Sequence, residues 1–502
     1  MSNKASKLFR KLSNQCDLSK DSWVIAPWHI SDEKPTVDSS ADPILICSYS
    51  WMLHSLNEPG IHVPGAPRKW NPPDVPFQVY KSTKSSFIDE NGHRARQFPF
   101  EPLMQATSLM NPDFKFDDVD IVCDRNTLRR LLPWGKCQTT DPFAVDLVVI
   151  GKTMFMCRKE HMTIGSGNGF GNEFENRATT SLLGLQRASS HHRVHMYKFG
   201  NLNIMVRHEV DAFHEDEAAY NNTDSQMISA YQPPKGLTTF QINRESTHAH
   251  KTILHPGGRV IDWKQIGEIK STGIGKSASP GQYMEQLWFS RTPLLFVGRH
   301  QNGNFEDLKA TKVDGMWKDW EQRHQPELAS LAALLQVTRD QVVTKMGGRA
   351  IMANLSACGQ IQLYEPKRIQ LAIPMEMVNR FWTERILKAP VANLISQQIQ
   401  YNAAITGYHG VPGNHQLPMG YHLIQGPATS KEVEMAIQQI RWRVQMSIEQ
   451  SQLAQQQPTD PPAPGLLRPL GLPPVQAEEQ GTPTLEEDDN MDLYEDPRPS
   501  SF

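Results

Sequence analysis

The chain has 502 residues, a formal net charge of −3 and 38% hydrophobic residues. That length suits two or three domains, or one large domain with extensions, and the apolar content is sufficient for a substantial core. Because the net charge is slightly negative, the protein as a whole does not attract nucleic acid electrostatically. Any nucleic-acid site must therefore be a local basic patch.

The cysteines and the absence of long apolar runs indicate an intracellular protein. The six cysteines show no Cys-x-x-Cys spacing; they are Cys16, Cys47, Cys123, Cys137, Cys157 and Cys358. This distribution is typical of reduced thiols and not of a disulfide framework or a zinc site. The sequence shows no secretory signal and no run that could span a bilayer. We expect a protein of the nucleus or the cytoplasm, with no membrane partner.

The composition divides the chain into four segments. Residues 1–44 are polar with a short basic start and predict a loose N-terminal extension, whereas residues 45–310 carry the patterns of a folded core. In residues 311–456, apolar residues recur at helical spacing, which predicts a helical extension that packs on the core or binds a protein partner. Residues 457–502 are rich in glutamine, proline and acidic residues, and we expect a disordered tail.

The first part of the core reads as strand, helix and two further strands. Asp120–Cys123 predicts a strand and Thr127–Leu132 a helix, while Phe143–Ile150 and Thr153–Arg158 predict two strands of a meander. Arg125 falls at the strand-to-helix junction, a common place for contact with a phosphate or carboxylate. The alternative role for this arginine is a structural or exposed salt bridge.

Glycine-rich stretches do not match either of the two common phosphate-binding motifs. The glycines of 165–171 permit a tight loop ahead of Glu173 and Glu175, but they cannot be read as Gly-x-Gly-x-x-Gly. The stretch 271–277 resembles a P-loop, yet Lys270 occupies the place of its first glycine. Dinucleotide binding and a Walker-type site are therefore not supported.

Two other motif types are also incomplete. The histidines of 191–195 and 248–250 lack a completing ligand at metal-site spacing, so we interpret them as surface or packing residues, with Arg193 as a possible substrate contact. A prenyl-diphosphate synthase needs two Asp-Asp-x-x-Asp helices. The acidic stretch 117–120 is not such a motif, and residues 486–489 lie in the tail.

The stretch 202–211 gathers charges at alternate positions of a predicted strand. Arg207, Glu209 and Asp211 leave one face, while Val210 leaves the other. We expect this strand at a sheet surface. Because like charges close together destabilise a sheet, the two carboxylates need a reason to be there.

A second strand-like stretch, 267–271, has a similar pattern. Glu268 and Lys270 project from one face, and Ile269 points into the core. A magnesium or manganese ion would explain the gathered carboxylates, because hard cations prefer several oxygen ligands. Glu209, Asp211 and Glu268 could supply them, and Lys270 would then stabilise a developing negative charge. The alternative is a solvated Glu-x-Lys salt bridge.

The segments after Lys270 complete a recognisable order. A helix is predicted over 282–290 and a strand over 294–300. The order of strand, Glu-x-Lys strand, helix and strand resembles the PD-(D/E)XK nuclease core. We therefore expect an α+β fold with a PD-(D/E)XK-like mixed β-sheet core flanked by helices.

The run from about residue 46 to residue 305 resembles the decapping exoribonuclease family. Five stretches are similar to its arginine, Gly-Φ-x-Φ-Glu, Glu-x-Asp and Glu-x-Lys motifs and to its last helix and strand; they are 120–132, 171–175, 209–211, 268–270 and 288–303. There are two departures. Asn172 stands where the family has an apolar residue, and Ser290 stands where its glutamine is expected.

The resemblance implies a metal-dependent hydrolase that acts on phosphodiester or pyrophosphate bonds at RNA 5′ ends, by decapping or by 5′→3′ exoribonuclease action, with Mg²⁺ or Mn²⁺. The implied metal ligands are Glu175, Glu209, Asp211 and Glu268. The implied catalytic residues are Glu209, Asp211, Glu268 and Lys270, and the substrate contacts are Arg125, Arg193 and Arg207. The alternative is a catalytically degenerate nuclease fold that binds RNA or a protein.

Overall fold

The computed structural model describes residues 3–383 apart from 17–21, 28–29, 31–32, 54–58, 84, 88, 137–141, 159–162, 167–168, 216–251, 355–359 and 368–370. The chain divides into two compact units, Met1–Tyr408 and His409–Phe502. All elements below belong to the first unit. The expected tail and the helical pattern beyond residue 383 lie outside the described residues.

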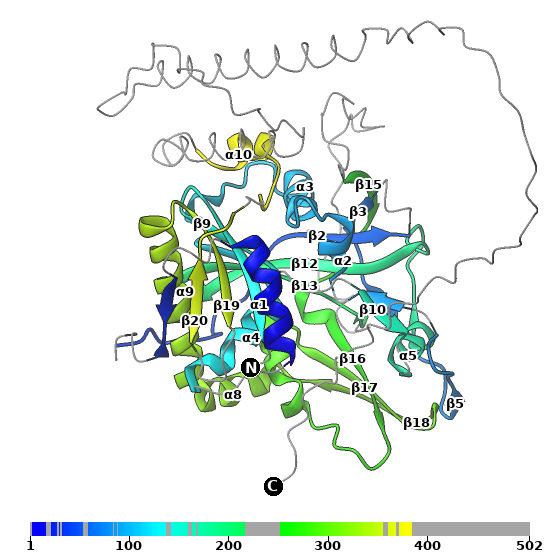
Figure 1. The fold of residues 1–502 in the computed structure, drawn as a ribbon. Helices are drawn as coiled ribbons and strands as arrows, with labels where there is room; N and C mark the ends of the chain where they lie inside the picture. Colours follow the sequence, from blue (N-terminus) through cyan, green and yellow to red (C-terminus); the bar gives the residue numbers. More distant parts are fainter. Residues whose placement is uncertain are drawn as a thin grey trace, which may run out of the picture. The chain divides into compact units, whose positions relative to one another are not determined.

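The larger sheet has eleven strands in the order β1-β20-β19-β8-β9-β7-β13-β12-β2-β3-β15 (Figure 1). Their bounds are Trp23–Ile25 (β1), Ile44–Met52 (β2), Gly60–Gly65 (β3), Ile121–Asp124 (β7), Phe143–Ile150 (β8), Thr153–Arg158 (β9), Ala188–Phe199 (β12), Leu202–Glu209 (β13), Ile253–Gly258 (β15), Arg349–Asn354 (β19) and Ile361–Tyr364 (β20). Strand β7 runs parallel to both β9 and β13, and β15 runs parallel to β3. The predicted β8–β9 hairpin is confirmed.

The smaller sheet has seven strands in the order β11-β4-β14-β16-β17-β18-β5. Their bounds are Arg68–Trp70 (β4), Phe77–Gln78 (β5), Thr179–Thr180 (β11), Ala212–Phe213 (β14), Ile266–Gly273 (β16), Leu294–Gln301 (β17) and Asn304–Lys312 (β18); β6 (Ser85–Phe87) and β10 (Thr163–Ser166) form a separate pair. Strands β16 and β17 are parallel, and the predicted helix α7 (Met284–Ser290) crosses between them.

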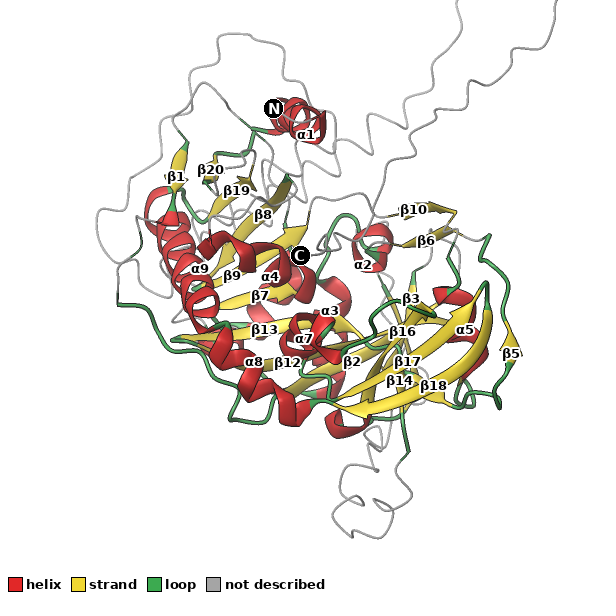
Figure 2. Ribbon diagram, turned by 90° about the horizontal axis from the view of Figure 1, so that it is seen from below, coloured by secondary structure: helices red, strands yellow, loops and turns green. Residues whose placement is uncertain are grey.

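Helices cover both faces of the larger sheet. The remaining helices are α1 (Asn3–Gln15), α2 (Glu90–Arg94), α3 (Glu101–Met110), α4 (Arg125–Leu131), α5 (Gly171–Ala178), α8 (Trp317–Arg323), α9 (Gln325–Lys345) and α10 (Met375–Phe381). Figure 2 shows α4, α7 and α9 over β7, β9 and β13, where they share one apolar core. Residues of α3 and α10 pack in a second core against the opposite face. The expected combination of large mixed sheets and helices is confirmed.

Strand β13 lies in the interior of the larger sheet, between β7 and β12. The prediction that one of its faces would be at the sheet surface is wrong, because both faces are covered. Ile204 and Val206 belong to the core beneath α4 and α7, whereas Met205 belongs to the core beneath α3. A strand with a parallel neighbour is typically covered on both faces, and this one is. The charged side chains at its end are therefore partly enclosed by protein.

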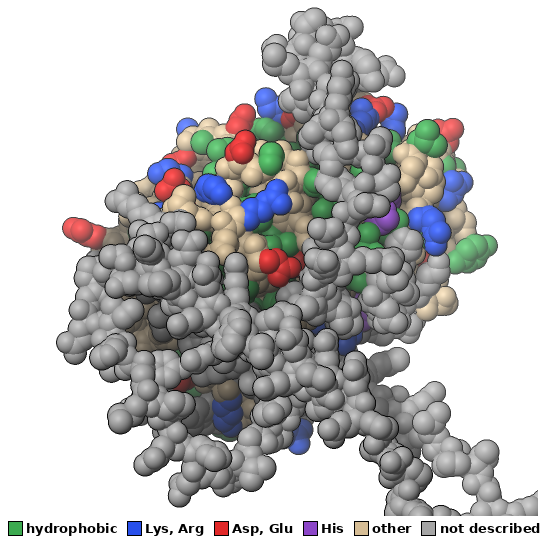
Figure 3. Space-filling view, turned by 90° about the horizontal axis from the view of Figure 1, so that it is seen from above, with side chains coloured by type: hydrophobic (Ala, Val, Ile, Leu, Met, Phe, Trp, Pro, Cys, Tyr) green, Lys and Arg blue, Asp and Glu red, His purple; other side chains and the backbone are tan. Residues whose placement is uncertain are grey.

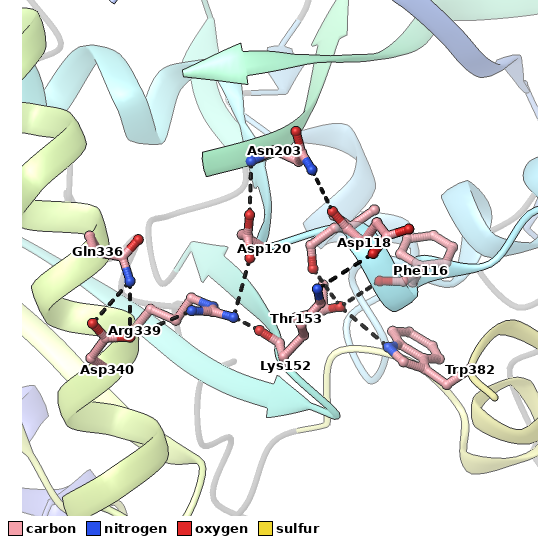
Figure 4. A network of polar contacts seen from close by, with 11 residues as sticks. Phe116, Asp118, Asp120, Lys152, Thr153, Asn203, Gln336, Arg339, Asp340 and Trp382 are labelled. Atoms are coloured by element: carbon pink, nitrogen blue, oxygen red, sulfur yellow. Dashed lines mark hydrogen bonds and ion pairs between the residues drawn. The ribbon is translucent and has the colours of Figure 1, made fainter. Parts of the chain in front are cut away.

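Helix α9 is tied to the sheet by a polar network that Figure 4 shows from close by. The Arg339 Nε atom donates to the Lys152 carbonyl over 2.8 Å, and Nη2 lies 3.2 Å from Asp120 Oδ1. Asp120 Oδ2 in turn accepts from the Asn203 backbone N–H over 2.9 Å. The network joins α9 to the turn before β9 and to the starts of β7 and β13, so the strands that lead to Arg125 and Glu209 share one anchor.

Two segments differ from the divisions expected from composition. The polar start of the chain contains β1, which pairs with β20, and Leu12 and Cys16 of the same region are buried against Ala144 and Tyr364. Strands β19 and β20 lie in the expected helical extension and continue the sheet beyond β8. Short buried strands do not show the alternation by which strands are recognised in sequence.

Two surface properties bear on the choice of partner. On the face seen in Figure 3, basic and acidic side chains of the described residues are interspersed and form no single broad patch. In the part of the chain that the structure describes, no helix is long and apolar enough to cross a membrane.

Candidate active site

The chain passes from one sheet to the other beside the predicted carboxylates. Strand β13 ends at Glu209 in the larger sheet, and β14 begins at Ala212 in the smaller one. Ala212 pairs with Gly267 of β16, so Asp211 arrives next to Glu268. The Ile269 backbone N–H donates to Asp211 Oδ2 over 2.8 Å. The Glu-x-Asp and Glu-x-Lys motifs therefore meet where the two sheets join.

Glu268 is the most enclosed carboxylate of this group, with 3% exposure. Lys270 Nζ lies 2.8 Å from Oε1 and Arg125 Nη1 lies 3.1 Å from Oε2, and the Gln286 side-chain amide donates to Oε1. Desolvation by burial raises the pKa of Glu268, but Lys270 and Arg125 together outweigh it and hold the pKa at about 2. Glu268 is thus ionised, and both of its oxygens are engaged.

Gln286 was missed by the sequence analysis, which placed the family's glutamine at position 290. Ser290 lies one turn later on α7 and donates to the Gln286 carbonyl over 2.8 Å, so it faces the helix and not the carboxylates. Gln286 instead points at Glu268 from the first turn of α7. Residues four apart share a helix face. The signal available in the sequence was a polar residue on the same helix face as position 290, one turn earlier.

The other carboxylates lie close enough to repel one another. Desolvation, followed by the charge of Asp211, raises the pKa of Glu175 well above its usual range, although Lys270 opposes the shift. Desolvation and Glu268 raise the pKa of Asp211 to about 7. The pKa of Glu209 is also raised, first by desolvation and then by Asp211, even though this side chain keeps exposed surface that water can reach. Unlike Glu268, these three carboxylates have too little positive charge nearby to lower their pKa values.

Helix α5 positions Glu175 through its aromatic neighbour. Phe174 is fully buried and stacks on Phe305 of β18, with ring centroids 4.2 Å apart. Trp70 and Phe77 pack around the same ring, so the helix is fixed to the smaller sheet through its apolar face. Glu175 follows directly in the chain and is held beside β16.

The residue types fit a hard divalent cation. Magnesium and manganese prefer carboxylate oxygens, and carboxylates whose mutual repulsion raises their pKa values gain when a cation is placed between them. Within the described residues, however, no three His, Cys, Asp or Glu side chains are already arranged to hold a metal ion. The four carboxylates are therefore suitable ligands by residue type, but their side chains would have to turn toward a common point to bind one ion.

The three predicted substrate arginines have different surroundings. Arg125 begins α4 and reaches Glu268, as described. Arg207 is 1% exposed and makes two bonds to the Asp124 carboxylate, of 2.7 and 3.2 Å. Arg193 is 1% exposed and donates to the Ile261 carbonyl over 2.7 Å. The structure brings only Arg125 to the carboxylates, because the other two guanidinium groups are buried with protein partners.

A family model described as Domain of unknown function (DUF8563) matches residues 24–382. The chain belongs to this family. The DUF8563 region begins within β1 and ends after α10, so it includes both sheets and every predicted site residue. No curated protein matches the sequence.

Several solved structures are similar to this DUF8563 chain. Rai1 of S. pombe in complex with 3′-FADP has a TM-score of 0.45 at 11% identity, covering 68% of this chain and 99% of that one. Rai1 of Scheffersomyces stipitis with (3′-NADP)+ and calcium ion has a TM-score of 0.45 at 10% identity, covering 72% and 98%. Rai1 of Candida albicans with pU5-Mn2+ has a TM-score of 0.43 at 11% identity, covering 72% and 99%. These proteins belong to the group that the motifs resemble, and at such TM-scores the likeness assigns no activity or residue to this chain.

Proposed function

We propose that this chain is a metal-dependent hydrolase that acts on phosphodiester or pyrophosphate bonds at RNA 5′ ends, on a PD-(D/E)XK-like core. The observation that supports it best is the meeting of Glu175, Asp211 and Glu268 from separate elements around Lys270, with Glu209 close by. Clusters of buried carboxylates with perturbed pKa values are typical of functional sites.

The proposed roles follow from the charge of each group. Glu175, Glu209, Asp211 and Glu268 would hold Mg²⁺ or Mn²⁺, which supplies polarisation of a phosphate oxygen when bound. Gln286 orients Glu268 through its side-chain amide. Arg125, at the start of α4, would contact a phosphate with the part of its guanidinium that faces away from Glu268.

Lys270 would act on the transition state. Burial opposes its charge, but Glu268 and Asp211 outweigh the desolvation and raise the pKa of Lys270, so the ammonium stays protonated. Its Nζ lies 2.8 Å from Glu268 Oε1 and over the Tyr283 ring, 6.0 Å from the ring centroid. A fixed ammonium can donate to a phosphate oxygen as negative charge develops, and such donors contribute mainly in the transition state.

One observation favours a second candidate, an RNA- or protein-binding module without catalysis. Both oxygens of Glu268 are already engaged by Arg125 and Lys270, and the described residues contain no arranged metal site. A nuclease fold that had replaced its cation by an arginine–glutamate–lysine network would look like this. The two candidates differ in metal binding and in turnover.

The test compares Lys270→Met with Glu268→Gln and a matched control. We expect Lys270→Met to lose on the order of a hundred-fold in RNA hydrolysis while it still binds manganese, because only carboxylate oxygens ligate the cation. Glu268→Gln should lose both. Lys309→Met is the control, since Lys309 is exposed on β18 in the same cross-strand row as Lys270. It should keep both properties.

The measurements are calorimetry with manganese and hydrolysis of single-stranded RNA that carries a modified 5′ end. Replacement of both Glu209 and Asp211 by alanine should also abolish hydrolysis while the protein stays folded, because these side chains repel one another and contribute little to the core. Full turnover in Lys270→Met would refute the transition-state role of Lys270. Wild-type protein that binds no metal and cleaves no RNA would support the binding module instead.

A further inference from the structure

A short segment beside α5, residues Val79 to Ser82, is held at both ends by backbone hydrogen bonds. The Val79 N–H donates to the Gly303 carbonyl over 2.8 Å, and the Ser82 N–H donates to the Gly169 carbonyl over 3.0 Å. We call this segment the strap. Its two middle residues, Tyr80 and Lys81, are exposed, and Tyr80 has 79% of its surface open to solvent.

The strap is supported by the turn between β17 and β18. Gly303 in this turn has a φ of +88°, and a Cβ atom there would collide with the Val79 carbonyl and with the Phe170 ring. Only glycine adopts this conformation and also permits the close approach. The turn, the strap and Phe170 therefore pack directly against each other, and Tyr80 projects from a supported backbone.

Aromatic rings and a cation lie side by side at this place. Lys81 Nζ is 5.9 Å from the centroid of the Phe170 ring, and the His300 ring lies with its centroid 4.7 Å from that of Phe170. Phe170 and His300 are each half-buried, so part of each ring remains accessible. Tyr80, the neighbour of Lys81 in the chain, adds a third exposed planar group on the same segment.

Charged groups of both signs lie near the strap. Lys81 and Lys276 are exposed, and Lys276 lies near enough to act on His300, where desolvation and then this lysine lower the pKa of the imidazole. Glu173, the nearest carboxylate on α5, accepts a hydrogen bond from Ser82 over 3.3 Å. Strand β18 adds the exposed Glu306, which accepts a hydrogen bond from Asn304, and Asp307, which lies across from Arg299.

The strap lies close to the proposed active site. Phe170 is the residue that precedes α5, and Glu175 of the carboxylate group follows five residues later in the same helix. Five residues of helix span about 8 Å. A polynucleotide with its reacting phosphate at the carboxylates thus needs to extend only a short way along α5 to reach the rings.

We infer that Tyr80, Lys81 and Phe170 form a stacking platform for single-stranded RNA, downstream of the nucleotide that is held at the carboxylates. Proteins that bind single strands combine exposed aromatic faces with basic side chains, because every base can stack and every phosphate is negative. A Tyr that is already fixed on a supported backbone binds a base without the cost of ordering a loop. The position of the platform on the substrate rests on the proposed function, whereas its affinity for single strands does not.

The test measures the binding of a 3′-labelled single-stranded RNA of ten nucleotides to the full chain by fluorescence anisotropy, with a chelator present so that no hydrolysis occurs. Tyr80→Leu should weaken binding on the order of tenfold, because stacking is lost while apolar surface is kept. Tyr80→Phe should bind like wild type. Lys81→Gln should reduce the slope of log affinity against log salt by about 0.7. Leu183→Ala is the control, since Leu183 is 94% exposed in a different part of the surface.

The outcomes separate this inference from the proposed function. If Tyr80→Leu binds RNA as tightly as wild type, the platform is wrong, even if the protein hydrolyses RNA. If binding depends on Tyr80 but wild-type protein with manganese cleaves no RNA, the platform stands and the proposed function fails. Equal losses in Tyr80→Leu and Tyr80→Phe would also overturn the inference, because they would show that the hydroxyl matters and the ring face does not.

Discussion

Arg207→Met tests whether Arg207 is a structural residue or a substrate contact. The Arg207 guanidinium makes two bonds to the Asp124 carboxylate, donates to the Pro99 carbonyl over 2.7 Å and lies 4.5 Å from the centroid of the Phe100 ring. Burial opposes its charge, but Asp124 outweighs the desolvation and raises the pKa of Arg207. The group is therefore charged, and all three of its nitrogen atoms are engaged within the protein.

Replacement by methionine keeps much of the side-chain volume and removes the charge. The Asp124 carboxylate, which is 9% exposed, then loses its partner. Breaking a buried pair from one side costs about 3–5 kcal/mol, and the lost contact with Phe100 adds about 0.5–2 kcal/mol. We expect Arg207→Met to be destabilised by about 3.5–7 kcal/mol in denaturant unfolding, whereas the exposed Arg323→Met should change by about 0.5 kcal/mol or less.

The double variant Arg207→Met/Asp124→Leu gives the internal check. Because a hydrophobic replacement of both partners leaves no orphaned charge, it should recover at least about 2 kcal/mol relative to Arg207→Met. If Arg207→Met unfolds at the same denaturant concentration as wild type and loses RNA affinity, Arg207 is a substrate contact and the structural interpretation is refuted.

Two further predictions concern the carboxylates and the C-terminal segment. The fold raises the pKa of Asp211 from 3.8 to about 7, so the folded state favours the protonated form of this side chain. The metal-free protein therefore loses stability as the pH rises from about 3.8 to about 7. Asp211→Asn should therefore raise the melting temperature in chelator more at pH 8 than at pH 4.5, and an equal shift at both would contradict the raised pKa. Removal of residues 457–502 should leave the melting temperature unchanged, because a segment rich in proline, glutamine and acidic residues buries little apolar surface. A fall of several degrees in the melting temperature would show that this segment contributes to the fold.

The sequence predicted the local elements of the core well. The strand at β7, the β8–β9 hairpin, helix α7 and strand β17 were all recognised, the helix from its 3.6-residue spacing and the strands from apolar runs bounded by polar or turn residues. The same rule placed Glu268 and Lys270 on one face, and the 2.8 Å contact between them agrees. It could not identify β19 and β20, because a buried run of four to six residues reads alike as strand or helix.

What the sequence could not provide was the long-range partner of each charge. The strand pattern placed Arg207 on the same face as Glu209 without indicating its partner. Only the fold shows that Asp124 lies beside Arg207, on the parallel strand β7. Motif spacing alone also did not show that Gln286, one helical turn before Ser290, contacts Glu268 on β16.

The crossing at Val210 places neighbouring carboxylates on two different sheets. Glu209 ends β13 of the larger sheet, whereas Asp211 accepts a hydrogen bond from Ile269 of the smaller one. A rotation of one sheet against the other would change the spacing between these two side chains before it broke any strand pairing. If the carboxylates hold a cation as proposed, its affinity would therefore depend on how firmly the two sheets pack against each other, for example through Val206 of β13 and Val297 of β17 in their shared core.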